Sequence, residues 1–258
     1  METKSKIKEN VDLAAEKFGF RYNKIGVESV VRADGSGIWK RNVELEVVGP
    51  QLEEIESRAI IFGDNKISEP SINVSGSAKG SKISYRTTQQ SDKSTIFVIE
   101  FSPSLKKGKK AKYSIKEEYG PGFYAMDKDF ILDMMKKGVW PYNEPYEEDS
   151  HKIAYPTNKL IKKLILPRNY KVSGKEYWDV TIGDSSSRAI GEYNRIKKEE
   201  DKHFNVTHSE EGNKILELTI DKPEIGLSYG FKWIPPSKGE YEKFLEESKV
   251  KAEGINRQ

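Results

Sequence analysis

Residues 225–236 read Ile-Gly-Leu-Ser-Tyr-Gly-Phe-Lys-Trp-Ile-Pro-Pro, and this stretch decides the fold class. Its bulky side chains fall at every second position: Ile225, Leu227, Tyr229, Phe231 and Trp233. A period of two is typical of a β-strand with one buried face. Pro235 and Pro236 end the strand because proline has no N–H to donate. We therefore predict that this stretch is the main core strand of a β-sheet domain.

Most of the chain repeats this pattern of short strands and turns. The clearest hairpin joins residues 27–31 to residues 38–48 through the turn Ala-Asp-Gly-Ser-Gly at 33–37. Further strands are predicted at residues 58–62, 71–75, 83–87, 95–101, 112–118, 160–166, 177–182, 188–196, 203–207 and 214–220. Apolar residues at helical spacing predict helices at 5–18, 127–137 and 237–253.

The segment around residue 145 predicts a break between two domains. Pro141 and Pro145 lie close together there and prevent both a helix and a central strand. We therefore predict a mainly β protein with two antiparallel β-sandwich domains in tandem, at 24–120 and 150–236. The predicted linker, 121–149, carries a short helix, and an N-terminal helix (1–23) and a C-terminal helix (237–258) flank the domains. Duplication of one ancestral domain and convergent sandwich chemistry both account for the similar halves.

Residues 101–108, Phe-Ser-Pro-Ser-Leu-Lys-Lys-Gly, are followed by Tyr113-Ser114-Ile115. This pattern resembles the region between strands E and F of immunoglobulin-like and fibronectin type III-like sandwiches. In those domains a Leu-x-x-Gly turn precedes a buried tyrosine, whose hydroxyl group bonds to nearby backbone. The resemblance covers about twenty residues. It implies an immunoglobulin-like fold and no particular activity.

Composition narrows the functional classes. The 258 residues carry a net charge of +3, with 44 basic and 41 acidic residues. This balance argues against a dedicated nucleic-acid binder. The chain has no cysteine, which excludes disulfides and cysteine-based zinc sites and favours the cytoplasm. No apolar run is long enough to cross a membrane, so we expect no membrane partner.

The predicted linker also contains the candidate binding residues. Trp140, Tyr142 and Tyr146 lie beside the carboxylates of Glu147 and Glu148. Rigid aromatic side chains make good contact surfaces because they lose little freedom on binding. One hypothesis is that these five residues bind a partner protein or a glycan. The other is that the rings hold the two domains together.

Other motifs give weaker signals. The lysine run at 106–112 is interpreted as a solvated hairpin tip, with contact to phosphate or anionic lipid as the alternative. His203 and His208 are five residues apart and would face opposite sides of one strand, so no metal site is predicted. No catalytic residues and no cofactor are predicted either.

Three functional hypotheses follow. The first is a cytoplasmic, non-catalytic adaptor that binds a protein partner through loops at the domain junction. The second is a structural or sensory subunit of a larger bacterial-type assembly, docked through its terminal helices. The third is an enzyme of a type that the sequence does not reveal, which would require a polar pocket with converging ionisable groups.

Overall fold

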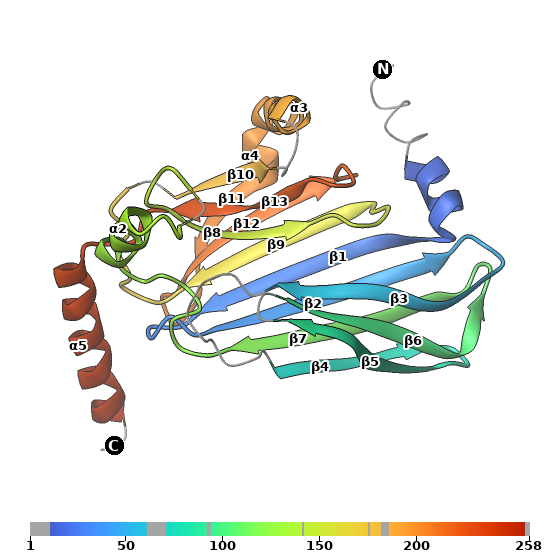
Figure 1. The fold of residues 1–258 in the computed structure, drawn as a ribbon, viewed down its shortest axis with the longest axis horizontal. Coiled ribbons are helices and arrows are strands. Elements are labelled where there is room, and N and C mark those ends of the chain that lie inside the picture. The colour runs from blue at the N-terminus through green and yellow to red at the C-terminus, as the bar shows by residue number, and fades with distance from the viewer. Residues whose placement is uncertain are drawn as a thin grey trace.

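The computed structural model describes residues 11–60, 71–91, 94–140, 142–174, 176–181 and 186–255, and these are mainly β-strand (Figure 1). The predicted mainly β class is therefore confirmed. The strands form one large sheet and two small ones.

The large sheet combines strands from both halves of the chain. In spatial order its seven described strands are β11 (Phe204–His208), β12 (Lys214–Asp221), β9 (Lys159–Leu166), β1 (Phe20–Val31), β2 (Gly37–Val47), β7 (Lys110–Tyr119) and β4 (Ser71–Ala78). Strands β1 and β2 are the predicted hairpin, with Val30 opposite Ile38. Strand β1 also pairs in parallel with β9, with Ile25 opposite Leu160.

Two small sheets cover the inner face of the large sheet. One consists of β3 (Gln51–Ile60), β6 (Ser94–Lys106) and β5 (Lys82–Ser91), and the other of β10 (Tyr177–Thr181), β13 (Ser228–Trp233) and β8 (Glu147–Lys152). Alternation puts Val27, Leu45 and Leu164 on the inner face, where they are almost fully buried. The three sheets therefore share one hydrophobic core. The outer face of the large sheet is left uncovered by described elements (Figure 1).

The stretch at 225–236 contains a core strand, as predicted, but the strand β13 covers only Ser228–Trp233, and residues 225–226 form a turn before it. Tyr229, Phe231 and Trp233 of β13 are fully buried, and the Phe231 ring lies 6.3 Å from the ring of Phe204 at the start of β11 in the large sheet. On the other side, Gly230 lies tight against β8, since an added Cβ would come 2.2 Å from the backbone oxygen of Asp149. This glycine lets the two strands approach closely.

Helices lie at the ends and edges of the sheets. The described part of the N-terminal helix spans residues 11–18, and the others are α2 (Lys128–Lys136), α3 (Ser186–Lys197), α4 (Glu200–His203) and α5 (Lys238–Ile255). Asp127 caps α2 by accepting the N–H of Phe130, as its position predicts. Helix α5 projects away from the sheets and is anchored at its base by Phe244, which packs against Tyr170 (Figure 1).

Two finer predictions about this architecture are not confirmed. The first is the pair of tandem sandwiches at 24–120 and 150–236, because the parallel β1–β9 pair joins strands from both predicted domains in one sheet. The immunoglobulin-like resemblance is not confirmed either. Tyr113, the expected corner tyrosine, meets the hydroxyl group of Tyr22 at 3.1 Å and not backbone.

The segment predicted as a strand at 188–196 is also different, because it lies within helix α3. Ala189, Glu192 and Ile196 are buried at helical spacing along it. The predicted helix at 237–253 is confirmed as α5. The part of the predicted first helix before residue 11 lies outside the described residues.

Candidate functional site

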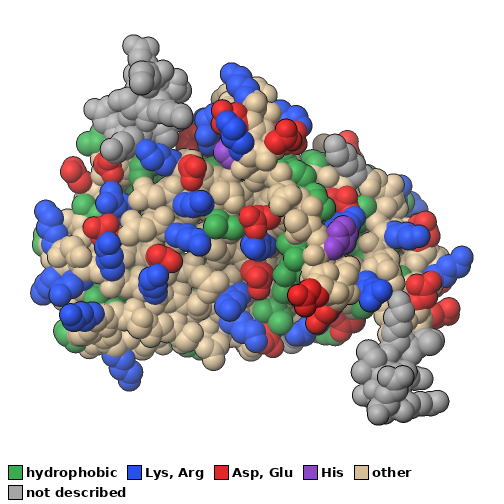
Figure 2. Space-filling view, turned by 180° about the vertical axis from the view of Figure 1, so that it is seen from behind, with side chains coloured by type: hydrophobic (Ala, Val, Ile, Leu, Met, Phe, Trp, Pro, Cys, Tyr) green, Lys and Arg blue, Asp and Glu red, His purple; other side chains and the backbone are tan. Residues whose placement is uncertain are grey.

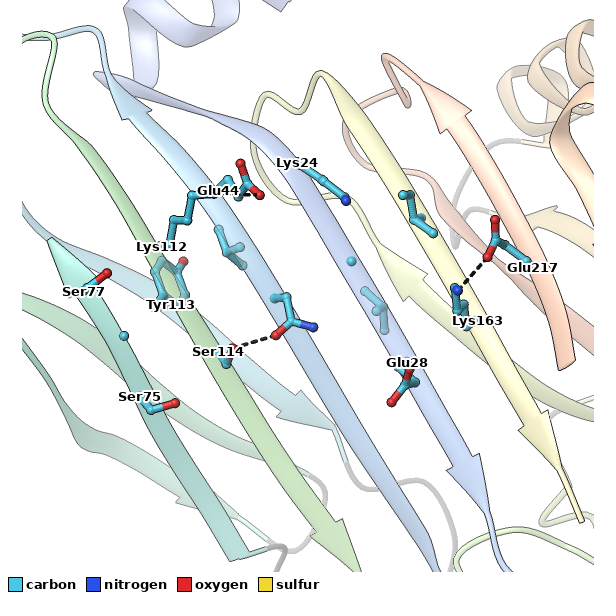
Figure 3. Close-up of a pocket in the computed structure, with 16 residues that line it drawn as sticks. Lys24, Glu28, Glu44, Ser75, Ser77, Lys112, Tyr113, Ser114, Lys163 and Glu217 are labelled. Atoms are coloured by element: carbon cyan, nitrogen blue, oxygen red, sulfur yellow. Dashed lines mark hydrogen bonds and ion pairs between the residues drawn. The ribbon is translucent and has the colours of Figure 1, made fainter. Parts of the chain in front are cut away.

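A transverse groove crosses the outer face of the large sheet. Its volume is about 640 Å³, and the residues that line it come from neighbouring strands across the sheet (Figure 3). The groove exists because side chains at one level of the sheet are short, while those at the levels on either side are long. Strand register produces this pattern, since residues directly opposite each other lie at the same level.

The floor of the groove is a row of mostly small residues, one from each of five neighbouring strands: Ile161, Gly26, Asn42, Ser114 and Ser75. Ser114 donates a hydrogen bond of 2.6 Å to Asn42 across the row (Figure 3). Gly26, which lies between Ile161 and Asn42 in this row, has no side chain to fill the space above it. The floor thus offers hydroxyl and amide groups to a ligand.

Charged side chains form the two rims. One rim contains Glu217, Lys163 and Glu28, and the other contains Lys24, Glu44 and Lys112. Two ion pairs lie along these rims, Lys163 with Glu217 at 2.8 Å and Lys112 with Glu44 at 3.2 Å. Three lysines and three glutamates therefore line the groove, and its charge is balanced.

The aromatic residues predicted as a partner-binding patch lie together beside the sheet formed by β10, β13 and β8. The rings of Tyr142 and Tyr146 stack with centroids 4.5 Å apart, and Trp140 contacts Tyr142 edge-on at 6.2 Å. Lys232 of β13 lies 4.5 Å from the Tyr146 ring and pairs with Asp179 at 2.5 Å. The rings thus enclose a lysine of the sheet, and their contact with a partner stays a prediction.

The two carboxylates of the predicted patch lie on opposite faces of β8. Glu148 faces outward, 3.9 Å from Lys232. Glu147 faces inward, is only 9% exposed and accepts the N–H of Ala125 at 2.6 Å. Burial raises the pKa of Glu147 to about 8, with the neighbouring carboxylates Asp149 and Glu148 adding to the effect and backbone hydrogen bonds opposing it.

A buried polar cluster joins the large sheet to β8. Lys162 of β9 and Asp149 of β8 are almost fully buried and form an ion pair at 2.5 Å. Lys162 donates to Ser29 at 2.6 Å, and Ser29 in turn donates to Asp149 at 3.1 Å. The ammonium group also lies 4.6 Å from the centre of the Trp39 ring. The ion pair is therefore well compensated for the loss of water.

The contact between Ser29 and Lys162 resembles that of a nucleophile beside a general base, but a substrate could not reach the Ser29 hydroxyl group. Both side chains are fully buried, so a substrate does not reach the Ser29 hydroxyl group in this conformation. Burial lowers the pKa of Lys162, and Asp149, at 2.5 Å, opposes that shift by stabilising the charged ammonium group. We assign this cluster to holding the sheets together.

The buried carboxylate predicts a pH effect on stability. Glu147 keeps its proton up to about pH 8 when folded and releases it near pH 4.5 when unfolded, so stability falls as pH rises between these values. Burial lowers the pKa of His151 well below 6.5, so that below pH 6.5 this group makes stability rise as pH rises. Between pH 6.5 and 8 we expect the wild type to lose up to about 2 kcal/mol of unfolding free energy.

Urea unfolding at the two pH values checks this expectation, with Glu147→Gln as the control. The Gln variant keeps an acceptor for the Ala125 N–H but does not titrate, so its stability should change little over the same interval. Equal losses in the two proteins would contradict a raised Glu147 pKa.

Within the described ranges, no group of three or more His, Cys, Asp or Glu side chains is placed to hold a metal ion. Among the same residues, no helix has the length and apolar character needed to span a membrane.

Sequence reasoning missed both the groove and the buried cluster. The groove depends on which strands are neighbours, which a single sequence does not reveal. One residue of the cluster could have been noticed in the sequence: Lys162 lies on the same face of β9 as the buried Leu160 and Leu164. A lysine on the apolar face of a strand predicts a buried partner of opposite charge.

Comparisons with known proteins give fold neighbours only. No family model and no curated protein matches this sequence. Similar solved structures include a "putative protease" from Parabacteroides distasonis ATCC 8503, with 10% identity, 83% of this chain and 40% of that chain covered, and a TM-score of 0.47. An M1 zinc metallopeptidase from Deinococcus radiodurans matches with 10% identity, 83% and 42% coverage and a TM-score of 0.42. The chain thus spans about two fifths of the structures it matches.

These comparisons correct two functional predictions. The descriptions of the matching structures name peptidases, which contradicts the prediction of a non-catalytic adaptor acting through the domain junction and, with it, the expectation of no enzymatic role. At 10% identity and TM-scores below 0.5, this likeness assigns no activity to the chain. The hypothesis of an enzyme of unrecognised type agrees better with them.

Proposed function

We propose that the transverse groove holds an extended peptide and that the chain is the substrate-holding part of a peptide-processing enzyme. The observation that carries this proposal is the groove itself, with a floor of hydroxyl and amide groups between two rims of balanced charge. The proposed reaction is peptide cleavage, which the descriptions of the similar structures name for those proteins. For this chain it is a hypothesis with its own test.

The size of the groove fits a peptide. Its floor crosses five strands, and neighbouring strands are about 4.8 Å apart, so it is about 20 Å long. An extended peptide advances about 3.3 Å per residue, and about six residues therefore fit along the floor. Asn42 and Ser114 can exchange hydrogen bonds with peptide groups of any sequence, because both side chains donate and accept.

The chemistry of the rims disfavours other polymers. A polyanion would meet the carboxylates of Glu28, Glu44 and Glu217. Sugars and nucleobases bind best to exposed aromatic faces. The only aromatic residue of the lining is Tyr113, and its ring is buried on the opposite face of the sheet. A peptide with side chains of both signs is the best match.

Filling the groove should abolish binding. An added Cβ at Gly26 would come no closer than 3.9 Å to Asn42, so Gly26→Leu should fold normally while its side chain occupies the floor. We expect this variant to bind a mixture of short random-sequence peptides at least about tenfold more weakly, a loss of about 1.4 kcal/mol. Fluorescence anisotropy with labelled peptides measures this change.

The matched control is Gly191→Leu on helix α3, where an added Cβ meets nothing within 4 Å. It should bind peptides as the wild type does. Tighter binding of polyglutamate, polylysine or a hexasaccharide than of the peptides would contradict the proposed ligand class. Mass spectrometry of the incubated peptides tests the enzymatic part: cleavage that Gly26→Leu removes supports it, and intact peptides contradict it.

A further inference from the structure

A second surface is separate from the groove floor and carries a strong positive charge. Seven exposed lysines gather at one end of the molecule: Lys79, Lys82, Lys106, Lys107, Lys109, Lys110 and Lys112. We call this set the lysine end. Figure 2 shows Lys and Arg side chains crowded along the left edge of the molecule, where this end lies.

Strand pairing brings these lysines together from two turns. Ala78, at the end of β4, pairs with Ala111 of β7, so the β4–β5 turn lies beside the β6–β7 turn. Backbone hydrogen bonds hold the second turn against β2 and the residues after it, with Gly108 donating to Val47 at 2.8 Å and Lys107 to Pro50 at 3.2 Å. The lysines therefore project from a well-held convex tip.

Little of this charge is neutralised within the described part of the chain. Lys112 pairs with Glu44 at 3.2 Å, and Lys106 donates to the amide oxygen of Gln51 at 2.8 Å. The other five lysines form no ion pair with a described residue. Five unpaired ammonium groups on one tip attract anions strongly at low ionic strength.

Apolar side chains lie at the same end. Gly19, which follows the N-terminal helix, accepts hydrogen bonds from Val48 and Gly49 and so places that helix beside the turn of the lysine end. On this helix Leu13 is 60% exposed and Phe18 is 40% exposed. Exposed apolar groups next to a cluster of lysines are the combination that binds the surface of an anionic bilayer.

We propose that the lysine end docks the protein on an anionic lipid surface, with Leu13 and Phe18 entering the headgroup region. The shape of the site favours lipid over nucleic acid. Its lysines lie on a convex tip, whereas single strands are held in grooves lined by aromatic rings. All seven cations of the site are lysines. A lysine binds phosphate as a point charge and, unlike arginine, makes no bidentate contact that fixes its orientation.

Vesicle sedimentation tests this docking. The probe is a phosphatidylcholine vesicle with or without phosphatidylserine, at low and high salt. We expect binding only with phosphatidylserine and at low salt. Each lysine should contribute about fivefold, so Lys107→Gln, Lys109→Gln and Lys110→Gln together should weaken binding about 100-fold. The matched control replaces Lys171, Lys198 and Lys243 by Gln, removes the same charge elsewhere and should weaken binding far less.

A further variant separates lipid from other polyanions. Leu13→Gln should weaken vesicle binding and leave unchanged any attraction to a short DNA duplex, because only the bilayer takes up the apolar side chain. Circular dichroism melts confirm that each variant is folded. Equal losses from the two triple variants, binding to phosphatidylcholine alone, or tighter binding to the duplex than to vesicles would overturn the proposal.

Discussion

Replacing Lys162 by methionine is expected to lower the free energy of unfolding by about 3–5 kcal/mol. The substitution leaves the Asp149 carboxylate without its ion-pair partner between the large sheet and β8, where the aspartate is 1% exposed. Among the described residues, the hydroxyl groups of Ser29, at 3.1 Å, and Tyr124, at 3.4 Å, would remain as hydrogen-bond donors to that carboxylate. Urea denaturation of the wild type and Lys162→Met measures the difference.

The double variant Lys162→Met/Asp149→Leu shows whether the loss comes from an orphaned charge. Two apolar side chains of similar volume need no water, so this protein should recover most of the lost stability. A double variant that is as unstable as Lys162→Met would indicate that packing at Lys162, and not the unpaired carboxylate, is responsible.

Gly230→Ala should have an effect of similar size, about 3 kcal/mol or more, for a purely steric reason. The added methyl group would lie 2.2 Å from the Asp149 backbone oxygen and 2.5 Å from the Ser150 Cα. Backbone atoms of a paired strand cannot move aside as the tip of a side chain can. We expect β8 to separate from β13, and hydrogen exchange at the amides of β8 should increase together with the loss of stability.

Gly191→Ala is the control for this substitution. It lies in the helix α3, has nothing within 4 Å of an added Cβ and should gain up to about 1 kcal/mol from helix propensity. A Gly230→Ala protein that is as stable as the wild type would contradict the close approach of the two strands.

The sequence predicted the strands far better than their arrangement. The hairpin 27–48 and the core strand around Tyr229 were found because alternation and turn residues are local signals. The parallel pairing of β1 with β9 was missed because a period of two shows which face is buried and not which strand lies alongside. The predicted tandem arrangement of two sandwiches is not confirmed for the same reason.

The segment that forms helix α3 fits both the alternation of a strand and the spacing of a helix. The sequence analysis predicts a strand at residues 188–196, although Ala189, Glu192 and Ile196 are spaced for one face of a helix. Glu192 hid this stripe because a carboxylate is not expected in a buried position. In the structure it pairs with Arg195 at 2.6 Å and accepts the Tyr229 hydroxyl group at 2.8 Å.

The candidate site was the least predictable part. Gly26, Asn42 and Ser114 come from three separate strands, and their alignment into one floor follows only from strand register. The aromatic cluster was found from sequence because its members are close along the chain. The groove could not be predicted from the sequence because its residues are far apart along the chain.

The parallel β1–β9 pair also determines when the protein can fold during synthesis. Ile25 and its partner Leu160 are 135 positions apart in the sequence, so the contact order of this sheet is high. Until β9 leaves the ribosome, one long edge of the nascent β1–β2 hairpin has no partner and can pair with another chain. Chaperones that bind exposed strands would act during this interval.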